Sequence, residues 1–152
     1  MLQNLYPHLL AFHSLLRWIV LAAALAAIFV AFSGWSGAKP ADPNLRRFSV
    51  IFVIAMDIAF LVGLLLFFGA SPITRGALAN LADAMKQQEP RFFAVEHTVL
   101  MLLAVFCAHV GGVLSRKGRT DLMKYRGAAI AFTLSLLLML SGIPWWRPLL
   151  RF

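Results

Sequence analysis

The sequence is poor in charged residues, especially acidic ones, and has a single cysteine. Asp, Glu, Lys and Arg make up 13% of its 152 residues, and only six of them are acidic. Soluble domains carry about 25% charged residues, so this composition excludes an ordinary soluble domain. Cys107 cannot form an intramolecular disulfide, and its position within an apolar run indicates a small packing residue.

Three kinds of motif are also missing from the chain. It has no internal repeat, no glycine-rich nucleotide-binding loop and no cysteine-based metal motif. The net charge of +8 does not indicate nucleic-acid binding, because the basic residues flank apolar runs and no extramembrane fold presents them. Contact with the anionic headgroups of membrane lipids explains the basic excess more simply.

Long apolar runs dominate the sequence, which is 61% hydrophobic with a mean hydropathy of +0.82. Four runs approach or exceed the roughly 18 to 20 residues that a helix needs to cross a bilayer, at about residues 5–33, 48–69, 92–114 and 128–143. They are continuously apolar rather than alternating, which favours helices over barrel strands. We therefore predict an all-α integral membrane four-helix bundle, with residues 1–152 forming a single membrane domain.

Two further segments need an interpretation. The first run carries His13 and Arg17, lacks a basic start and is too long for the apolar core of a signal peptide, so we expect it to stay in the mature protein. Residues 74–86 place apolar side chains at helical spacing, which predicts a short helix lying on the membrane surface.

The distribution of Lys and Arg among the short loops predicts the orientation. The first and third loops together are more basic than the opposite side, which predicts that they are cytoplasmic and that both termini are external. The first and third loops hold Lys39, Arg46, Arg47, Arg116, Lys117, Arg119, Lys124 and Arg126, and the opposite side holds Arg75, Lys86, Arg91, Arg147 and Arg151.

Ionisable side chains within the spans are the main candidates for function. Such groups cost at least a few kcal/mol in hydrocarbon and normally face the bundle interior, where they have partners or functions. The set is dense for so small a protein, and the fourth span adds none to it. Its members are His13 and Arg17 in the first span, Asp57 in the second, and Glu96, His97 and His109 in the third, with His8 near the start of the first.

Depth in the membrane decides which of these side chains meet. With a rise of about 1.5 Å per residue, His13 and His97 come within about 5 Å of the same level, whereas His109 lies about 18 Å further along its helix than His97. The same counting places Arg17 level with Asp57, which predicts an ion pair between them.

Two imidazoles at one depth on facing helices suit the two axial positions of a haem b. Two alternatives remain at this point. The histidines could simply hydrogen-bond across helices, or His8, His13, Glu96 and His97 could form a site for copper, zinc or non-haem iron. Glu96 and His97 are adjacent and point about 100° apart around a helix, which disfavours the second alternative.

Four motifs carry a resemblance that covers nearly the whole chain: HSLLRW at residues 13–18, RFFAVEH at 91–97, HVG at 109–111 and IPW at 143–145. They resemble small four-span bacterial membrane proteins loosely labelled cytochrome b-like. The resemblance implies a b-type haem in a membrane electron-transfer chain, with His13 and His97 as its ligands. It also implies a bacterial inner membrane. The second and fourth spans have no histidine, so a second haem near His109 lacks an evident histidine partner.

Two functions from different classes follow. The first is a b-type cytochrome that passes electrons between a quinol pool or small donor and a larger redox complex. In that function His13 and His97 are the metal ligands, Arg17 stabilises a haem propionate and Glu96 accepts an imidazole N–H. His8 and His109 are the reserve ligands, and His109 otherwise packs or forms a hydrogen bond near the cytoplasmic side. The second function is that of a cofactor-free accessory or assembly subunit.

Overall fold

The computed structural model describes residues 2–40 and 42–148. The chain folds as η1 (Leu2–Leu5), α1 (Tyr6–Ser36), α2 (Pro43–Leu65), η2 (Leu66–Ala70), α3 (Pro72–Ala79), α4 (Leu81–Ala84), α5 (Gln88–Arg91), η3 (Phe92–Glu96), α6 (His97–Lys117) and α7 (Asp121–Gly142). Four continuous helical segments, Tyr6–Ser36, Pro43–Ala70, Gln88–Lys117 and Asp121–Gly142, are long and apolar enough to cross a membrane. The predicted all-α four-helix bundle of an integral membrane protein is confirmed.

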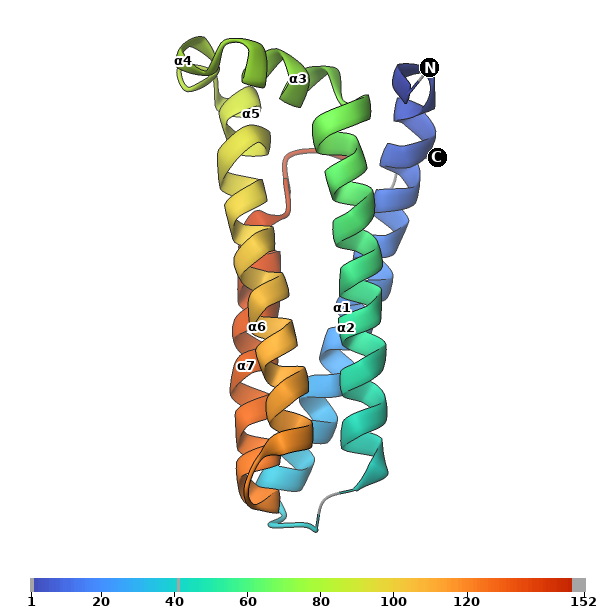
Figure 1. The fold of residues 1–152 in the computed structure, drawn as a ribbon, viewed down its shortest axis with the longest axis vertical. Coiled ribbons are helices and arrows are strands. Elements are labelled where there is room, and N and C mark those ends of the chain that lie inside the picture. Colours follow the sequence, from blue (N-terminus) through green and yellow to red (C-terminus); the bar gives the residue numbers. More distant parts are fainter. Residues whose placement is uncertain (1, 41, 149–152) are drawn as a thin grey trace.

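The bundle has two different ends (Figure 1). We call one the terminal end, because it carries η1, the short helices α3, α4 and α5, and residues 143–148, which follow α7. We call the other the loop end, because it carries only the turn between α1 and α2 and the turn between α6 and α7. Consecutive long helices therefore run in opposite directions, and α1 and α6 run in the same direction.

Two helices begin earlier than the hydropathy predicts, because capping residues set their starts. Asp42 accepts a hydrogen bond from the Asn44 backbone N–H at 2.8 Å, and α2 begins directly after it at Pro43. Thr120 accepts one from the Met123 N–H at 3.2 Å, and α7 begins at Asp121. Side-chain caps satisfy backbone N–H groups that the helix itself cannot, so both helices extend past the apolar run into polar sequence.

The predicted surface helix at residues 74–86 is present in a different form. It is divided into α3 and α4 at Asn80, whose backbone leaves the helical conformation at φ −143° and ψ 80°. The Asn80 side chain accepts a hydrogen bond from the Asp83 N–H at 3.2 Å and so caps α4. The prediction of a single helix over these residues was wrong. Asparagine competes for backbone hydrogen bonds and favours the start of a helix.

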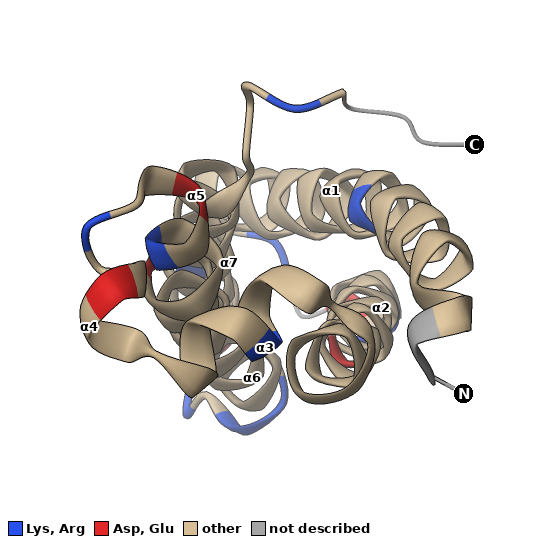
Figure 2. Cartoon of the chain, turned by 90° about the horizontal axis from the view of Figure 1, so that it is seen from above, with Lys and Arg blue, Asp and Glu red and all other residues tan. Residues whose placement is uncertain are grey.

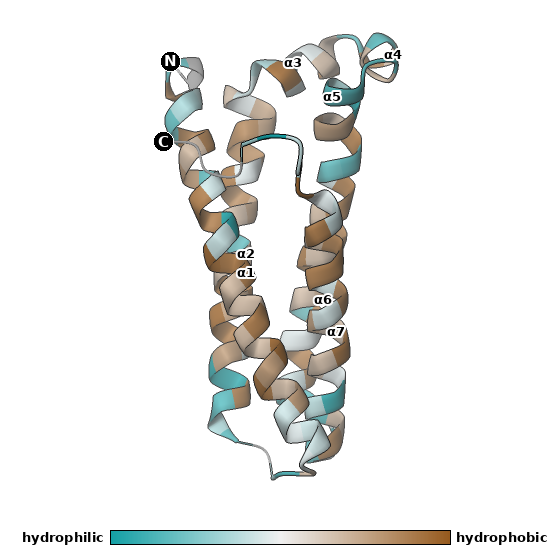
Figure 3. Cartoon of the chain, turned by 180° about the vertical axis from the view of Figure 1, so that it is seen from behind, coloured by the Kyte–Doolittle hydropathy of each residue, from teal (hydrophilic) through white to brown (hydrophobic). Residues whose placement is uncertain are grey.

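The tight part of the core lies towards the loop end. There Tyr125 of α7 packs against Gly34 of α1 so closely that a Cβ on Gly34 would stand 2.0 Å from the tyrosine ring. About two turns along α7 from Tyr125, Phe132 fills the space over Gly111 of α6 in the same way. Many large apolar side chains of the four spans are exposed, and the hydrophilic residues are mostly near the two ends of the bundle (Figure 3). This is the pattern of a protein solvated by lipid.

Candidate functional site

A cavity of about 180 Å³ occupies the half of the bundle nearer the terminal end. All four membrane spans line it, together with residues of η2 and α3 and the segment 143–148. We call residues 143–148 the C-terminal strap, because they run from the end of α7 towards α1 (Figures 1 and 2). The half of the bundle nearer the terminal end therefore contains open space, whereas the half nearer the loop end is closely packed.

The two histidines predicted to share one depth meet in this cavity. His13 projects from α1, and His97 is the first residue of α6. Their ring centroids are 6.4 Å apart and the ring planes are nearly perpendicular, at 80°. Phe92 and Phe93 of η3 flank His97, each with its ring centroid 6.0 Å from the imidazole. The predicted meeting of the two imidazoles is confirmed, and their role as metal ligands stays a prediction.

Hydrogen bonds orient one of the two rings and leave the other with a buried polar atom. Nδ1 of His97 lies 2.7 Å from the carbonyl oxygen of Gly142, the last residue of α7. Because a carbonyl only accepts, Nδ1 carries the proton and Nε2 keeps its lone pair. Nδ1 of His13 is buried and has no hydrogen-bond partner among the described residues. Such a buried polar atom is costly and needs an explanation.

The cavity is cationic. Arg17 of α1 and Arg147 of the C-terminal strap line it together with the two histidines, and no Asp or Glu of the described residues belongs to its lining. Arg17 is one helical turn from His13, towards the loop end, and its guanidinium carbon is 5.5 Å from the centre of the Trp18 ring. Because Arg147 is paired with Glu89, the net positive charge at the cavity comes from Arg17, and it favours an anionic ligand.

Arg147 is the site residue that the sequence analysis missed. It was counted only as a loop charge, yet it is held at the cavity by an ion pair with Glu89 of α5 and by stacking over Phe93, 4.4 Å from the ring centroid. A contact between Trp146 and Phe92, with ring centroids 4.6 Å apart, fixes the strap beside it. The IPW motif was the available signal, because Pro144 ends the helix and turns the following residues back across the bundle.

Two predicted site residues lie away from the histidine pair. Glu96 is exposed and forms an ion pair with Arg91 at 2.7 Å. We expected Glu96 to accept a hydrogen bond from an imidazole N–H. The Nδ1–H of His97 instead donates to the Gly142 carbonyl, so the predicted role of Glu96 was wrong. His8 is exposed and does not line the cavity, which removes its position as a reserve ligand.

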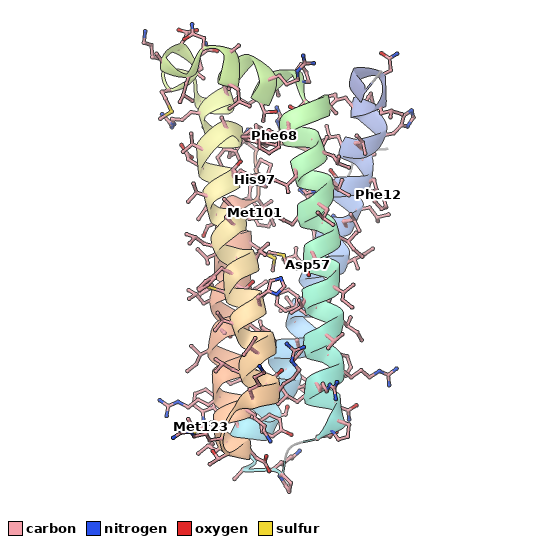
Figure 4. All side chains as sticks on the ribbon, in the orientation of Figure 1. Phe12, Asp57, Phe68, His97, Met101 and Met123 are labelled. Carbon is pink, nitrogen blue, oxygen red and sulfur yellow. The ribbon has the colours of Figure 1, made fainter. Side chains whose placement is uncertain are left out.

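The predicted ion pair between Arg17 and Asp57 was also wrong. Asp57 of α2 instead accepts a hydrogen bond from Nε2 of His109 on α6, at 2.9 Å. Depth counting gave the level correctly but not the direction around the helix. Met56 and Ala59 of α2 face the cavity that Arg17 lines, whereas Asp57 lies where α2 faces α6 (Figure 4). The expectation that His109 forms a hydrogen bond is confirmed.

The fold and the cavity define this chain as an all-helical integral membrane protein with a histidine pair inside a cationic cavity. Comparisons with protein-family profiles, curated proteins and solved structures give no significant match. The resemblance to cytochrome b-like membrane proteins stays a prediction from the sequence motifs.

Proposed function

We propose that this protein is a membrane b-type cytochrome that binds one haem b between α1 and α6, with His13 and His97 as the axial ligands. The separation of the two imidazoles carries the proposal. A nitrogen of imidazole bonds a transition metal at about 2.0–2.1 Å and lies about 1.1–1.2 Å from its ring centre, so two axial imidazoles have centroids about 6.4 Å apart. The observed centroid separation is 6.4 Å.

The donor set also supports a haem over the other metal sites. Among the described residues, no three His, Cys, Asp or Glu side chains gather where they could hold a metal ion. A zinc or copper site takes three or four protein ligands, whereas a haem brings four nitrogens of its own and needs two. The buried Nδ1 of His13 fits the same conclusion, because an imidazole nitrogen with no hydrogen-bond partner among the described residues is available as a metal ligand.

The chain's own residues contribute binding, orientation and charge. The Gly142 carbonyl fixes the tautomer of His97 and directs its Nε2 lone pair away from α7. Arg17 would offset the negative charge of a propionate, and Arg147, which is paired with Glu89, would add hydrogen-bond donors at the cavity. When bound, the haem supplies reversible one-electron chemistry.

The size of the cavity sets one requirement for haem binding. At about 180 Å³ it is smaller than the roughly 300–1,000 Å³ of pockets for drug-sized ligands, so a porphyrin enters only if lining side chains repack. Met56, Met101 and Met139 line the cavity, and methionine is the side chain that adapts most readily because it is unbranched and flexible.

Orientation and partners complete the proposal. The basic first and third loops lie at the loop end, so the positive-inside rule supports a cytoplasmic loop end and an external terminal end. The haem would then lie in the outer half of a bacterial inner membrane. The proposed electron partners are a quinol pool or a larger membrane redox complex, and the small mass outside the bundle fits an accessory subunit equally well.

Absorption spectroscopy of the purified protein tests the proposal. We expect a Soret band and split visible bands on reduction, and we expect His13→Ala and His97→Ala each to abolish or convert this low-spin spectrum. His8→Ala is the matched control and should leave it unchanged, because His8 is exposed outside the cavity. An unchanged low-spin spectrum in both cavity variants would refute the ligand assignment. A colourless protein, expressed with ample haem, would favour the accessory subunit instead.

A further inference from the structure

The hydrogen-bonded pair of Asp57 and His109, which we call the dyad, lies on the outside of the bundle. The side chains are 40% and 52% exposed, although they belong to the middle parts of α2 and α6. Around them the exposed side chains are apolar, including Ile54, Ile58 and Phe106. The dyad is therefore accessible from the lipid phase.

This position is unusual for a carboxylate. Ionisable residues within membrane spans almost always face the bundle interior or a water-filled cavity, because hydrocarbon solvates them poorly. Asp57 is 14 residues from the start of a 28-residue span, so it lies near mid-membrane and far from water at either end. A polar pair kept at this position is a functional-site candidate, and its ligand would come from the bilayer.

The dyad is also next to the histidine cavity. Val105 and Phe60 both line that cavity, and they lie four and three residues from His109 and Asp57 respectively, or about one helical turn. Beyond the dyad α2 and α6 approach closely, with Val53 within 3.2 Å of where a Cβ on Gly112 would stand. The dyad therefore lies beside the cavity, between α2 and α6, before the contact that closes the space between the two helices, and Figure 4 shows Asp57 on the side of α2 that faces α6.

The hydrogen bond determines what the dyad can bind. With Asp57 ionised and His109 neutral, Nε2 of His109 carries the proton and donates to Asp57 Oδ1, which leaves Nδ1 as an acceptor. In the part of the chain that the structure describes, Nδ1 of His109 makes no hydrogen bond of its own. A histidine whose tautomer is fixed by a carboxylate is suited to accept a hydrogen bond, and then a proton, from a hydroxyl group.

We propose that the dyad is a binding site for the hydroxyl headgroup of a lipid-soluble hydroquinone, with His109 Nδ1 as the hydrogen-bond acceptor. The large apolar side chains beside it favour a ligand with an apolar tail over a second copy of the chain. Interfaces between membrane helices instead gather small residues that let the backbones approach, whereas Phe106 and Ile54 are 65% and 53% exposed here. Binding of the hydroquinone does not depend on the proposed cytochrome function. Only the role of the hydroquinone as an electron donor rests on that function.

Binding of a simple phenol to the purified protein in lipid nanodiscs tests the site without any redox step. The probe is a phenol with a para-decyl chain, and its methyl ether is the matched control ligand that lacks the hydrogen-bond donor. We expect saturable one-to-one binding of the phenol by calorimetry, after subtraction of empty nanodiscs. The ether, and the phenol with Asp57→Asn or His109→Phe, should bind about 10-fold more weakly or worse. Ser141→Ala, an exposed hydroxyl at the far end of α7, should change nothing.

The outcomes separate this inference from the cytochrome function. Equal binding of phenol and ether, or undiminished binding by both dyad variants, would overturn the hydroquinone site even if the haem spectrum is as expected. Phenol binding that depends on the dyad in a protein that takes up no haem would support the site and reject the cytochrome. A dimer in which the dyad is covered by a second copy and binds no phenol would also overturn the proposal. Asp57→Asn keeps the side-chain shape, so it remains informative if His109→Phe fails to fold.

Discussion

Replacing the dyad with leucines tests whether Asp57 is stabilised by His109. The carboxylate lies near mid-span and half exposed to lipid, where an isolated Asp costs about 2.5–3.5 kcal/mol on insertion scales. His109→Leu removes its partner and should lower the free energy of unfolding by about 2–3 kcal/mol. Adding Asp57→Leu removes the isolated charge, so the double variant should be more stable than His109→Leu alone.

The coupling energy gives this prediction its size. Hydrogen bonds between membrane helices average about 0.6 kcal/mol in double-mutant cycles and reach about 1.7, and a charged acceptor favours the upper part of that range. We therefore expect a coupling of about 1–2 kcal/mol between Asp57 and His109, measured by reversible unfolding in mixed detergent micelles.

A second cycle provides the control. Arg17→Leu and Asp57→Leu should be additive within about 0.5 kcal/mol, because Arg17 lines the cavity and Asp57 faces α6. Additive losses in the Asp57 and His109 cycle, or coupling in the Arg17 and Asp57 cycle, would refute the pairing that the structure gives.

Three further predictions concern other parts of the molecule. Arg147→Gln should weaken haem retention in a dialysis assay, because Arg147 lines the cavity. The low-spin spectrum of the haem that remains bound should be unchanged, because Arg147 is not a proposed ligand of the iron. Gly34→Ala should destabilise the protein by about 1–3 kcal/mol in the same unfolding assay, because the added Cβ would overlap the Tyr125 ring. The Tyr125 hydroxyl forms hydrogen bonds with the backbone of Pro40 and Asp42, so the ring cannot easily move away. Gly76→Ala, which places its Cβ in open space on α3, is the control. A cysteine placed near Lys117 should resist a membrane-impermeant reagent in intact cells, and its labelling would reverse the orientation.

The four spans could be predicted from the sequence because hydropathy depends only on which residues are apolar. Their exact starts could not, because Asp42 and Thr120 extend α2 and α7 by side-chain capping, which hydropathy does not measure. Asn80 divides the surface helix for the same reason. Local hydrogen bonds, rather than apolar content, set the ends of the elements.

The candidate site divides in a similar way. The common depth of His13 and His97 needed only the rise per residue and the parallel direction of α1 and α6, whereas the direction of each ring did not follow from it. The partner of Asp57 needed the direction of each side chain around its helix, which depends on how the helices pack and which counting along the chain does not give. Arg147 reaches the cavity through the non-helical C-terminal strap, whose path no periodicity predicts.

Two π-helical turns lie at the same end of the bundle as the cavity. η2 and η3 are both at that end, and their residues Leu66, Phe67 and Phe93 contribute to the cavity lining. A π-helical turn takes an additional residue, so side chains before and after it differ by about 100° from α-helical spacing. His97 follows η3 directly, and its orientation towards His13 therefore depends on that turn. Helical spacing continued from Arg91 would direct the imidazole elsewhere, which makes η3 part of the site as well as part of the span.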